Sequence, residues 1–181
     1  ELLSGKIEDR NVVVLARTLR ALGVRLERVV MILDDPSAIE SEVRALSAAH
    51  DWLFTSGGVG PTHDDVTVES VARAFDKELV MQPKMEQMLR DYYGDRLTDG
   101  HLLMARVPEG ARLVTANDTP WPAVVMHNVW VLPGVPQIFQ MKMLLVRAEL
   151  AGDAPFLSLA VLTSLDEGQL KPLLDAVVAA Y

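Results

Sequence analysis

The feature that most restricts the fold of this chain is an alternation of helix-like apolar stripes with short β-branched runs. The stripe that begins at Asn11 repeats at helical spacing and stops at Gly23, and the run from Val29 to Leu33 suits a buried strand. The expected elements of this half are a helix over 11–22, a strand over 25–33, a helix from 36, a strand over 51–56 and a helix over 67–75. The alternation predicts an α/β fold with parallel strands and crossover helices.

The second half is less regular. We expect a helix over 83–93, irregular chain over 94–122, a hairpin of 124–126 with 129–132, a turn at 133–136 and a helix over 136–150. The composition changes at 151–155, which we interpret as a linker, and a strand over 156–163 and a helix towards Ala180 follow. The chain therefore divides into a domain over 1–150 and, over 151–181, a linker with the start of a small α+β domain.

Composition narrows the class of protein. Half of the 181 residues are hydrophobic, and cysteine is absent, which excludes thiolate metal sites and cysteine nucleophiles. The net charge of −8, without a basic stripe, argues against nucleic-acid binding. Apolar runs are too short to span a bilayer, and no signal peptide is visible, so we expect a soluble, cytoplasmic protein. Because Glu1 opens directly on a loop, we expect the sequence to be a fragment or to lack its first strand.

The stretch TSGGVGPTHDDVT, residues 55–67, carries the strongest functional signal. Gly57, Gly58 and Gly60 separate a predicted strand from a predicted helix, where α/β sheets bind ligands and helix N-termini favour phosphate. The motif is neither a P-loop nor GxGxxG. A tight turn alone would explain a lone Gly-Gly, whereas the longer motif with two aspartates favours a site.

Paired aspartates accompany this loop. Asp64 and Asp65 lie within it, and Asp34 and Asp35 follow the preceding predicted strand, so parallel strands would bring both pairs to one edge. Such a group suits a hard divalent cation, typically Mg²⁺. Helix capping explains Asp35 and one of Asp64 and Asp65, but not both members of each pair. We therefore assign Asp34 and Asp65 to catalysis, and both of them with Asp64 to metal binding.

Other polar residues carry weaker signals. Thr62 and Thr67 can bind phosphate or cap a helix, and Trp121 can pack or provide a stacking platform. The predicted phosphate- and ligand-binding residues are Ser56, Gly57, Gly58, Gly60, Pro61, Thr62 and Thr67, together with Ser4, Gly5 and Asn11 from the opening loop.

These motifs, in this order, resemble a known family. The segments Glu1–Ile7 with Asp9 and Asn11, Asp34-Asp35, Thr55–Thr67 and Leu132–Pro136 resemble the molybdopterin-binding (MoaB/Mog-like) domain. The variant is that of CinA-type competence/damage-inducible proteins and of some eukaryotic FAD synthases. The resemblance covers about residues 1–150, and the tail from Phe156 resembles the small domain that follows in the same proteins. Segment 117–122 lacks the family's usual glycines, which resembles the FAD-synthase-like branch.

The resemblance implies a three-layer α/β/α sandwich with a mostly parallel sheet and a homo-oligomer. It also implies two functions. One is binding of molybdopterin or a nucleotide, with phosphate on the glycine amides. The other is hydrolysis of a pyrophosphate bond in ADP-ribose or FAD, dependent on Mg²⁺, Mn²⁺ or Co²⁺. A third interpretation, a scaffold that has lost its ligand, is disfavoured because the loop glycines and aspartates are all present.

Overall fold

A four-stranded sheet forms the centre of the computed structural model, which describes residues 2–116, 119, 121–150 and 156–180. The strands are β1 (Leu53–Ser56), β4 (Arg112–Val114), β5 (Ala123–Met126) and β6 (Val129–Leu132), in the spatial order β1-β6-β5-β4. β1 pairs in parallel with β6, whereas β5 runs antiparallel to both β6 and β4. The sheet is therefore mixed, and β5 and β6 form the hairpin that the sequence predicts.

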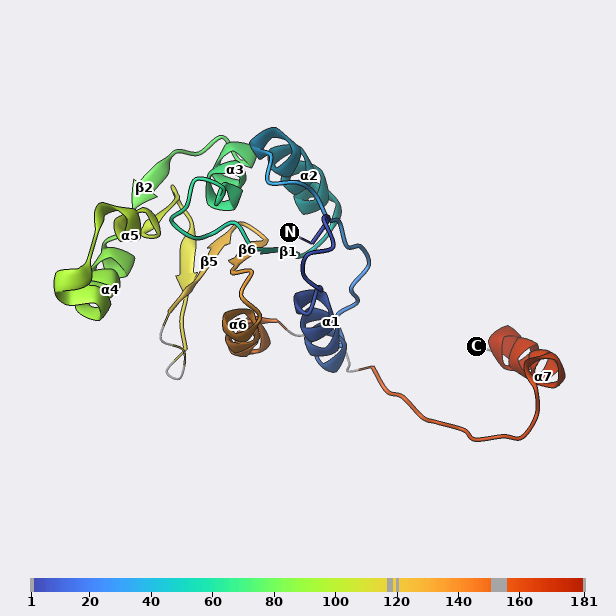
Figure 1. Cartoon of the computed structure of the whole chain (residues 1–181). Helices are drawn as coiled ribbons and strands as arrows, with labels where there is room; N and C mark the ends of the chain where they lie inside the picture. The colour runs from blue at the N-terminus through green and yellow to red at the C-terminus, as the bar shows by residue number, and fades with distance from the viewer. Residues whose placement is uncertain (1, 117–118, 120, 151–155, 181) are drawn as a thin grey trace.

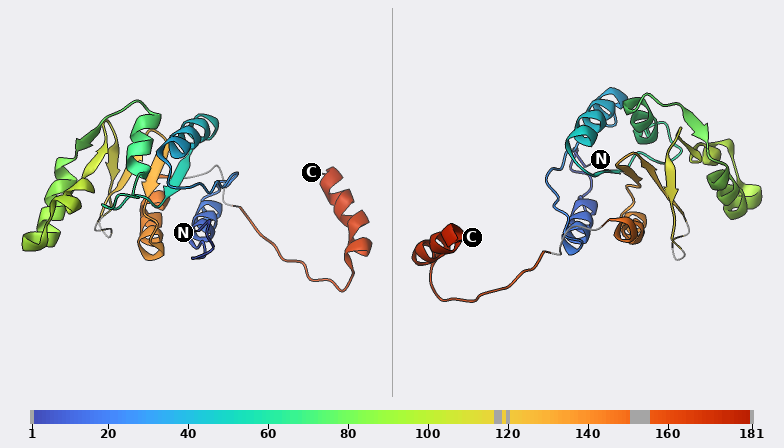
Figure 2. Two further views of the ribbon diagram at one scale, coloured as in Figure 1. Left: turned by 45° about the horizontal axis from the view of Figure 1, so that its top comes forward. Right: turned by 180° about the vertical axis from the view of Figure 1, so that it is seen from behind.

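Helices cover both faces of this sheet (Figures 1 and 2). One face carries α1 (Asn11–Ala21) and α6 (Pro136–Glu149), and the other carries α2 (Pro36–Ala49) and α3 (Thr67–Ala74). Side chains alternate along β6, so Trp130 packs with α1 and α6 while Val131 packs with α2 and α3. The predicted three-layer α/β/α architecture is thereby confirmed.

The hairpin turn also fixes α2. Asn128 donates from Nδ2 to the carbonyl oxygens of Ser47 and His50, both at 2.9 Å, and its Oδ1 accepts from Ser47 Oγ at 2.6 Å. Its neighbour His127 adopts φ +52° and stacks obliquely on Phe75. One turn residue thus satisfies the Ser47 carbonyl in the last turn of α2 and that of the C-cap residue His50.

A smaller unit extends from α3 and lies to one side of the sheet in Figure 1. It consists of β2 (Leu79–Met81) paired antiparallel with β3 (Arg106–Pro108), α4 (Pro83–Tyr93), the short 3₁₀ turn η1 (Gly94–Arg96) and α5 (Asp99–Leu103). The expectation of irregular chain over 94–122 is therefore wrong in part, because α5, β3 and β4 lie within it. These elements have three to five residues, too short to show a period in the sequence.

The predicted strand over 25–33 is wrong. This segment carries no β-ladder, and Val29, Met31 and Leu33 are 48%, 47% and 69% exposed. The physical reason is pairing, since β1 hydrogen-bonds only to β6 and no described strand lies beside its other edge. A β-branched run becomes a strand only when a neighbour takes up its backbone hydrogen bonds.

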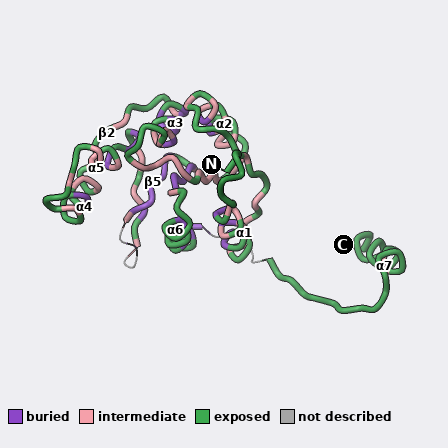
Figure 3. Tube along the Cα trace, in the orientation of Figure 1, coloured by how far each residue is buried: buried purple, intermediate pink, exposed green. Residues whose placement is uncertain are grey.

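The predicted strand over 156–163 is also wrong, because no described strand pairs with it and Leu157, Leu159 and Leu162 are at least 90% exposed. The helix beyond it is confirmed as α7 (Glu167–Ala180), which lies apart from the layered region and is exposed except at the half-buried Leu170 (Figure 3). Arg20 of α1 contacts the start of this tail, with its guanidinium 5.7 Å from the Phe156 ring centroid. The predicted linker, 151–155, lies outside the described residues.

Within the described part of the chain, no helix is both long and apolar enough to cross a membrane.

Candidate functional site

The glycine loop leaves β1 where that strand and β6 end together. Ser56 pairs with Leu132, and the N–H of Gly57 donates to the Leu132 carbonyl at 3.0 Å. Gly57 adopts φ +105° and lies against Gly134, where a Cβ would approach Gly57 Cα to 3.1 Å. The N–H of Gly57, predicted as a phosphate donor, is already used by the sheet in this structure. Gly134, which has no Cβ, permits the close crossing of two distant segments, and Gly57 supplies the positive φ of the turn.

Asn11, at the first position of α1, joins three segments at this edge. Its Nδ2 donates to Ser56 Oγ and to the Gly134 carbonyl, both at 2.8 Å, and the Asp9 carboxylate accepts from its backbone N–H. Asn11 is 8% exposed, and its buried Oδ1 has no hydrogen-bond partner among the described residues. An orphaned buried acceptor is costly, so its presence marks a place where a donor from a ligand or water fits.

The middle of the loop is held against the start of α3. The N–H of Thr67 donates to the Gly58 carbonyl at 3.0 Å, and a Cβ on Gly58, which has φ +65°, would lie 2.3 Å from Thr67 Oγ1. The N–H groups of Gly58, Val59 and Gly60 have no acceptor among the described residues. Three donors beside a helix N-terminus can bind an anion.

Asp64 and Asp65 converge on one hydroxyl at the end of the loop. Thr62 Oγ1 lies 2.6 Å from Asp64 Oδ1 and 2.5 Å from Asp65 Oδ2, and the Thr62 N–H donates to Asp65 Oδ2 at 3.0 Å. The hydrogen bond from Thr62, with a second from the Asp64 backbone, lowers the pKa of Asp64. The single proton of the Thr62 hydroxyl does not cancel the charge of either carboxylate. The carboxylate oxygens that remain can accept a hydrogen bond from a ligand or coordinate a cation.

Helix capping explains one predicted aspartate only. Asp35 Oδ1 accepts from the Ala38 N–H at 2.8 Å and caps α2. The N-cap of α3 is Val66, with no side-chain hydrogen bond, so neither Asp64 nor Asp65 is a cap. Asp34 is exposed beside Asp35. Among the described residues, no three acidic or histidine side chains gather tightly enough to form a metal cluster.

A cavity of about 170 Å³ adjoins the loop and reaches the smaller β2–β3 unit. Gly60, Pro61, Thr62 and Asp65 form its loop side, and apolar side chains with Glu69 and Arg106 form the rest; these apolar residues are Val59, Val68, Leu79, Leu103 and Met104. An apolar wall with a few charged groups is typical of small-molecule sites. Arg106 and Glu69 were not predicted, because Arg106 belongs to the three-residue strand β3 and Glu69 lies in α3, just beyond the end of the glycine motif.

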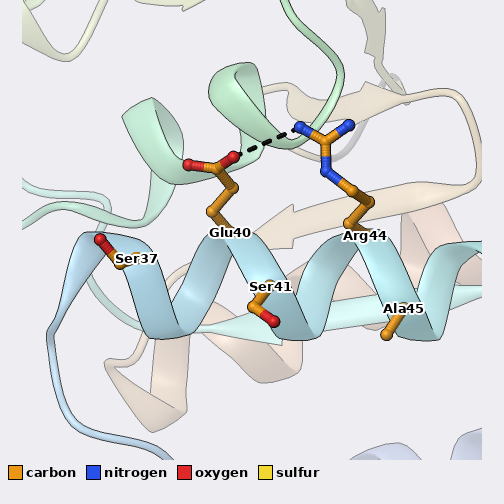
Figure 4. Close-up of a pocket in the computed structure, with 5 residues that line it drawn as sticks. All are labelled: Ser37, Glu40, Ser41, Arg44 and Ala45. Carbon is orange, nitrogen blue, oxygen red and sulfur yellow. Dashed lines mark hydrogen bonds and ion pairs between the residues drawn. The ribbon is translucent and has the colours of Figure 1, made fainter.

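A larger hollow of about 630 Å³ runs along α2 and is lined by Ser37, Glu40, Ser41, Arg44 and Ala45 (Figure 4). Every lining residue comes from one helix, and its two charged groups pair with each other at 3.3 Å. It is therefore a shallow surface groove with its charges satisfied, and we assign the site to the glycine loop instead.

The opening loop lies in a turn closed by the Gly5 N–H, which donates to the Leu2 carbonyl at 2.9 Å. Ser4 and Gly5 are exposed there, and Gly5 has φ +71°. Of the predicted residues, the structure thus joins Asn11, Ser56, Gly57, Gly58 and Thr67 at one edge. Gly60, Pro61, Thr62 and Asp65 line the adjoining cavity.

Known proteins resemble this chain over the region that contains the glycine loop. A family model described as "Probable molybdopterin binding domain" matches residues 1–151. A CinA-like protein of Desulfosudis oleivorans is 35% identical over 80% of this chain and 36% of its own length. A probable FAD synthase of Caenorhabditis elegans is 31% identical over 76% of this chain and 31% of its own length. The solved CinA of Thermoplasma acidophilum, whose function is given as unknown, is 30% identical with a TM-score of 0.71, covering 82% of this chain and 90% of that one.

The matched relatives are mostly longer proteins. The chain spans 58% of one relative, from Archaeoglobus fulgidus, and 31% to 37% of the CinA-like and FAD synthase relatives. The likeness is therefore one of a shared domain.

Proposed function

This chain belongs to the family of molybdopterin-binding-like (MoaB/Mog-like) domains, in its CinA-like form, and from that premise we propose that it binds a phosphate-bearing pterin or nucleotide at the glycine loop. The observation that carries the proposal is the arrangement of unused groups at one sheet edge. Within the part of the chain that the structure describes, the N–H groups of Gly58 and Gly60 beside the N-terminus of α3 have no acceptor, and Asn11 Oδ1 is a buried acceptor without a partner.

Each of these groups has a counterpart in such a ligand. Phosphate oxygens accept from backbone N–H groups and are favoured by the positive end of a helix. Pterin and adenine rings carry N–H donors and an apolar face, which suit a buried acceptor and a cavity walled by Val59, Leu103 and Met104. The 170 Å³ cavity is far smaller than a whole dinucleotide, so it would take one ring or one phosphate, with the rest at the open edge.

Calorimetry with molybdopterin, ADP-ribose and FAD tests the proposal, and a Gly60→Ala variant ties binding to the loop. A Cβ on Gly60 would lie 2.5 Å from Asp65 Oδ2, so the loop must move. We expect affinity to fall by about 10- to 100-fold, as for loss of a supporting group in a built site. Gly100→Ala is the matched control, because its Cβ meets nothing closer than 3.5 Å. Failure of all three ligands to bind the unmodified protein would reject the proposal.

Asp64 and Asp65 favour a second function, a divalent-metal-dependent pyrophosphatase acting on ADP-ribose or FAD. Their carboxylates surround the Thr62 hydroxyl and offer hard oxygen donors, which fit Mg²⁺, Mn²⁺ or Co²⁺. Asp64 and Asp65, with Asp34 as the further predicted ligand, would hold the cation. When bound, the cation would neutralise charge on the pyrophosphate. The free N–H groups of Gly58 and Gly60 would orient the phosphate, and Thr62 would hold Asp65 in place.

Release of AMP from ADP-ribose or FAD, assayed with each metal, decides between binding and turnover. Asp65→Asn should abolish AMP release while leaving the fold intact, because the amide keeps the acceptor oxygen but loses the negative charge. Glu167→Gln on the distant helix α7 is the control for loss of one charge. Tight binding of ADP-ribose with no release of AMP in the presence of any of the metals would favour the binding function and refute the pyrophosphatase.

We further propose, from the sequence, that the protein forms a homo-oligomer, is cytoplasmic and has no nucleic-acid partner, and that its chain divides into two domains near residue 150.

A further inference from the structure

Lys142 of α6 is a buried cation without an acidic partner in the described structure. Its side chain is 5% exposed, and Nζ donates to the carbonyl oxygens of Trp121 and of Pro122, the latter at 2.9 Å. Burial lowers the pKa of Lys142 to about 8. Burial of an ammonium group is costly, and a methionine would fill similar space without that cost. The cation therefore has a role that packing does not explain.

The two carbonyls that Lys142 holds lie at the edge of the sheet that carries the glycine loop. Val124 pairs with Val131, so Ala123 lies opposite Leu132, which in turn pairs with Ser56. Pro122 is therefore the residue just beyond the sheet on β5, as Gly57 is on β1. With about 4.8 Å between neighbouring strands, the two lie roughly 10 Å apart along the edge.

Lys142 also links this segment to the crossing of the glycines. Its helix begins at Pro136, two residues after Gly134, which packs against Gly57. On the other side, the half-buried Trp121 ring makes an edge contact with Tyr92 of α4, at 5.7 Å between centroids. The Lys142 ammonium group thus fixes the Trp121–Pro122 segment, on one side of this sheet edge, relative to the glycine loop on the other side.

We propose that Lys142 is a positioning residue of the ligand site, holding the Trp121–Pro122 segment as the rim that contacts the ring system of a phosphate-bearing ligand. The inference rests on the proposed binding function and adds to it the second side of the site. The phosphate would lie on the glycine loop, and the ring roughly 10 Å away along the edge, which is the reach of a nucleotide rather than of free phosphate.

The absence of cysteine allows a chemical test of the ammonium group itself. Lys142→Cys is unfolded in urea, alkylated with 2-bromoethylamine, which restores an ammonium at nearly the length of lysine, and refolded. The same variant alkylated with 1-bromopropane provides a neutral group of matched size. Lys77→Cys, at an exposed position, treated in both ways, controls for the procedure.

Two measurements are made on each protein: the Kd for ADP-ribose with Mg²⁺, and amide hydrogen exchange of the peptide that covers residues 119–124. We expect the propyl form to lose affinity by about 10- to 100-fold and to exchange faster over 119–124. The aminoethyl form should recover both to within a few-fold of the unmodified protein, and both Lys77 forms should match it.

Faster exchange with unchanged affinity in the propyl form would show that Lys142 only anchors the loop and would overturn the inference. Equal exchange and affinity in the two alkylated forms would overturn it as well. If ADP-ribose does not bind, the same Kd comparison is made with whichever of molybdopterin and FAD does. Failure of all three to bind the unmodified protein would instead reject the binding function, and this inference with it.

Discussion

Replacement of Lys142 by methionine should remove a specific pH dependence of stability. The pKa of Lys142 falls from 10.5 for a free side chain to about 8 in the fold. At about 1.4 kcal/mol per pKa unit, this difference corresponds to about 3 kcal/mol of destabilisation wherever the folded state must keep the proton. The side chain is 5% exposed, so solvent screens little of this cost.

The sign follows from proton counting. Below pH 8 both folded and unfolded chains hold the proton, and the cost is present in full. Between pH 8 and 10.5 the unfolded chain holds more protons, so the free energy of unfolding rises with pH. About 2–3 kcal/mol of the cost is removed between pH 7 and pH 10, because the folded state is then largely neutral while the unfolded chain is only partly so.

Urea unfolding of both proteins at pH 7 and pH 10 measures the effect. All other titrating groups are shared, so the change between the two pH values in the unmodified protein minus the change in Lys142→Met isolates Lys142. We expect this difference to be about 2–3 kcal/mol. At pH 7 alone the free energies of unfolding of the two proteins should differ by less than this amount. Loss of the buried charge in Lys142→Met then offsets the loss of two charged hydrogen bonds. An identical pH response in the two proteins would refute the burial of the cation.

Three further outcomes are expected. Gly134→Ala should lower the free energy of unfolding by about 1–3 kcal/mol, because its Cβ would lie 3.1 Å from Gly57 Cα; an unchanged urea midpoint would contradict the close crossing. Thr62→Val should raise the pKa of Asp64 towards its ordinary value, because the hydroxyl is the main cause of its lowering; NMR titration of the carboxyl carbon measures it, and an unshifted midpoint would count against the hydrogen bond. Light scattering should give a mass above 19.9 kDa if the expected homo-oligomer forms, and a monomer mass would dismiss it.

The helices and the hairpin could be predicted because their signals are local. The stripe over 11–22, the Asp35-Pro36 start and the run around His127-Asn128 each match an element to within a few residues. The β-branched run within 25–33 and the apolar run over 156–163 have a composition that suits a strand, but neither forms one. A strand is a relation between two segments, and composition does not show whether a partner is present.

The candidate site likewise has parts that a local motif predicts and parts that depend on contacts between distant segments. The glycine loop with Thr62, Asp64 and Asp65 was predicted from a continuous motif, and the structure joins those side chains. The sequence did not reveal that the sheet takes the Gly57 N–H, nor that Lys142 is buried. Both facts depend on segments far apart in the chain, and a lysine within an apolar helix is usually exposed at its end.

The hydrogen bonds of Asn11 have a consequence for the order in which the protein assembles. Its partners Ser56 and Gly134 lie 45 and 123 positions along the chain. Contacts between such distant segments carry a loop-closure cost and tend to form late in folding. During synthesis the loop from Gly57 to Asp65 leaves the ribosome well before Gly134 does, so a nascent chain has its binding motif but not its binding site. Only a completely folded chain would therefore bind the ligand, and binding would in turn stabilise the folded state by mass action.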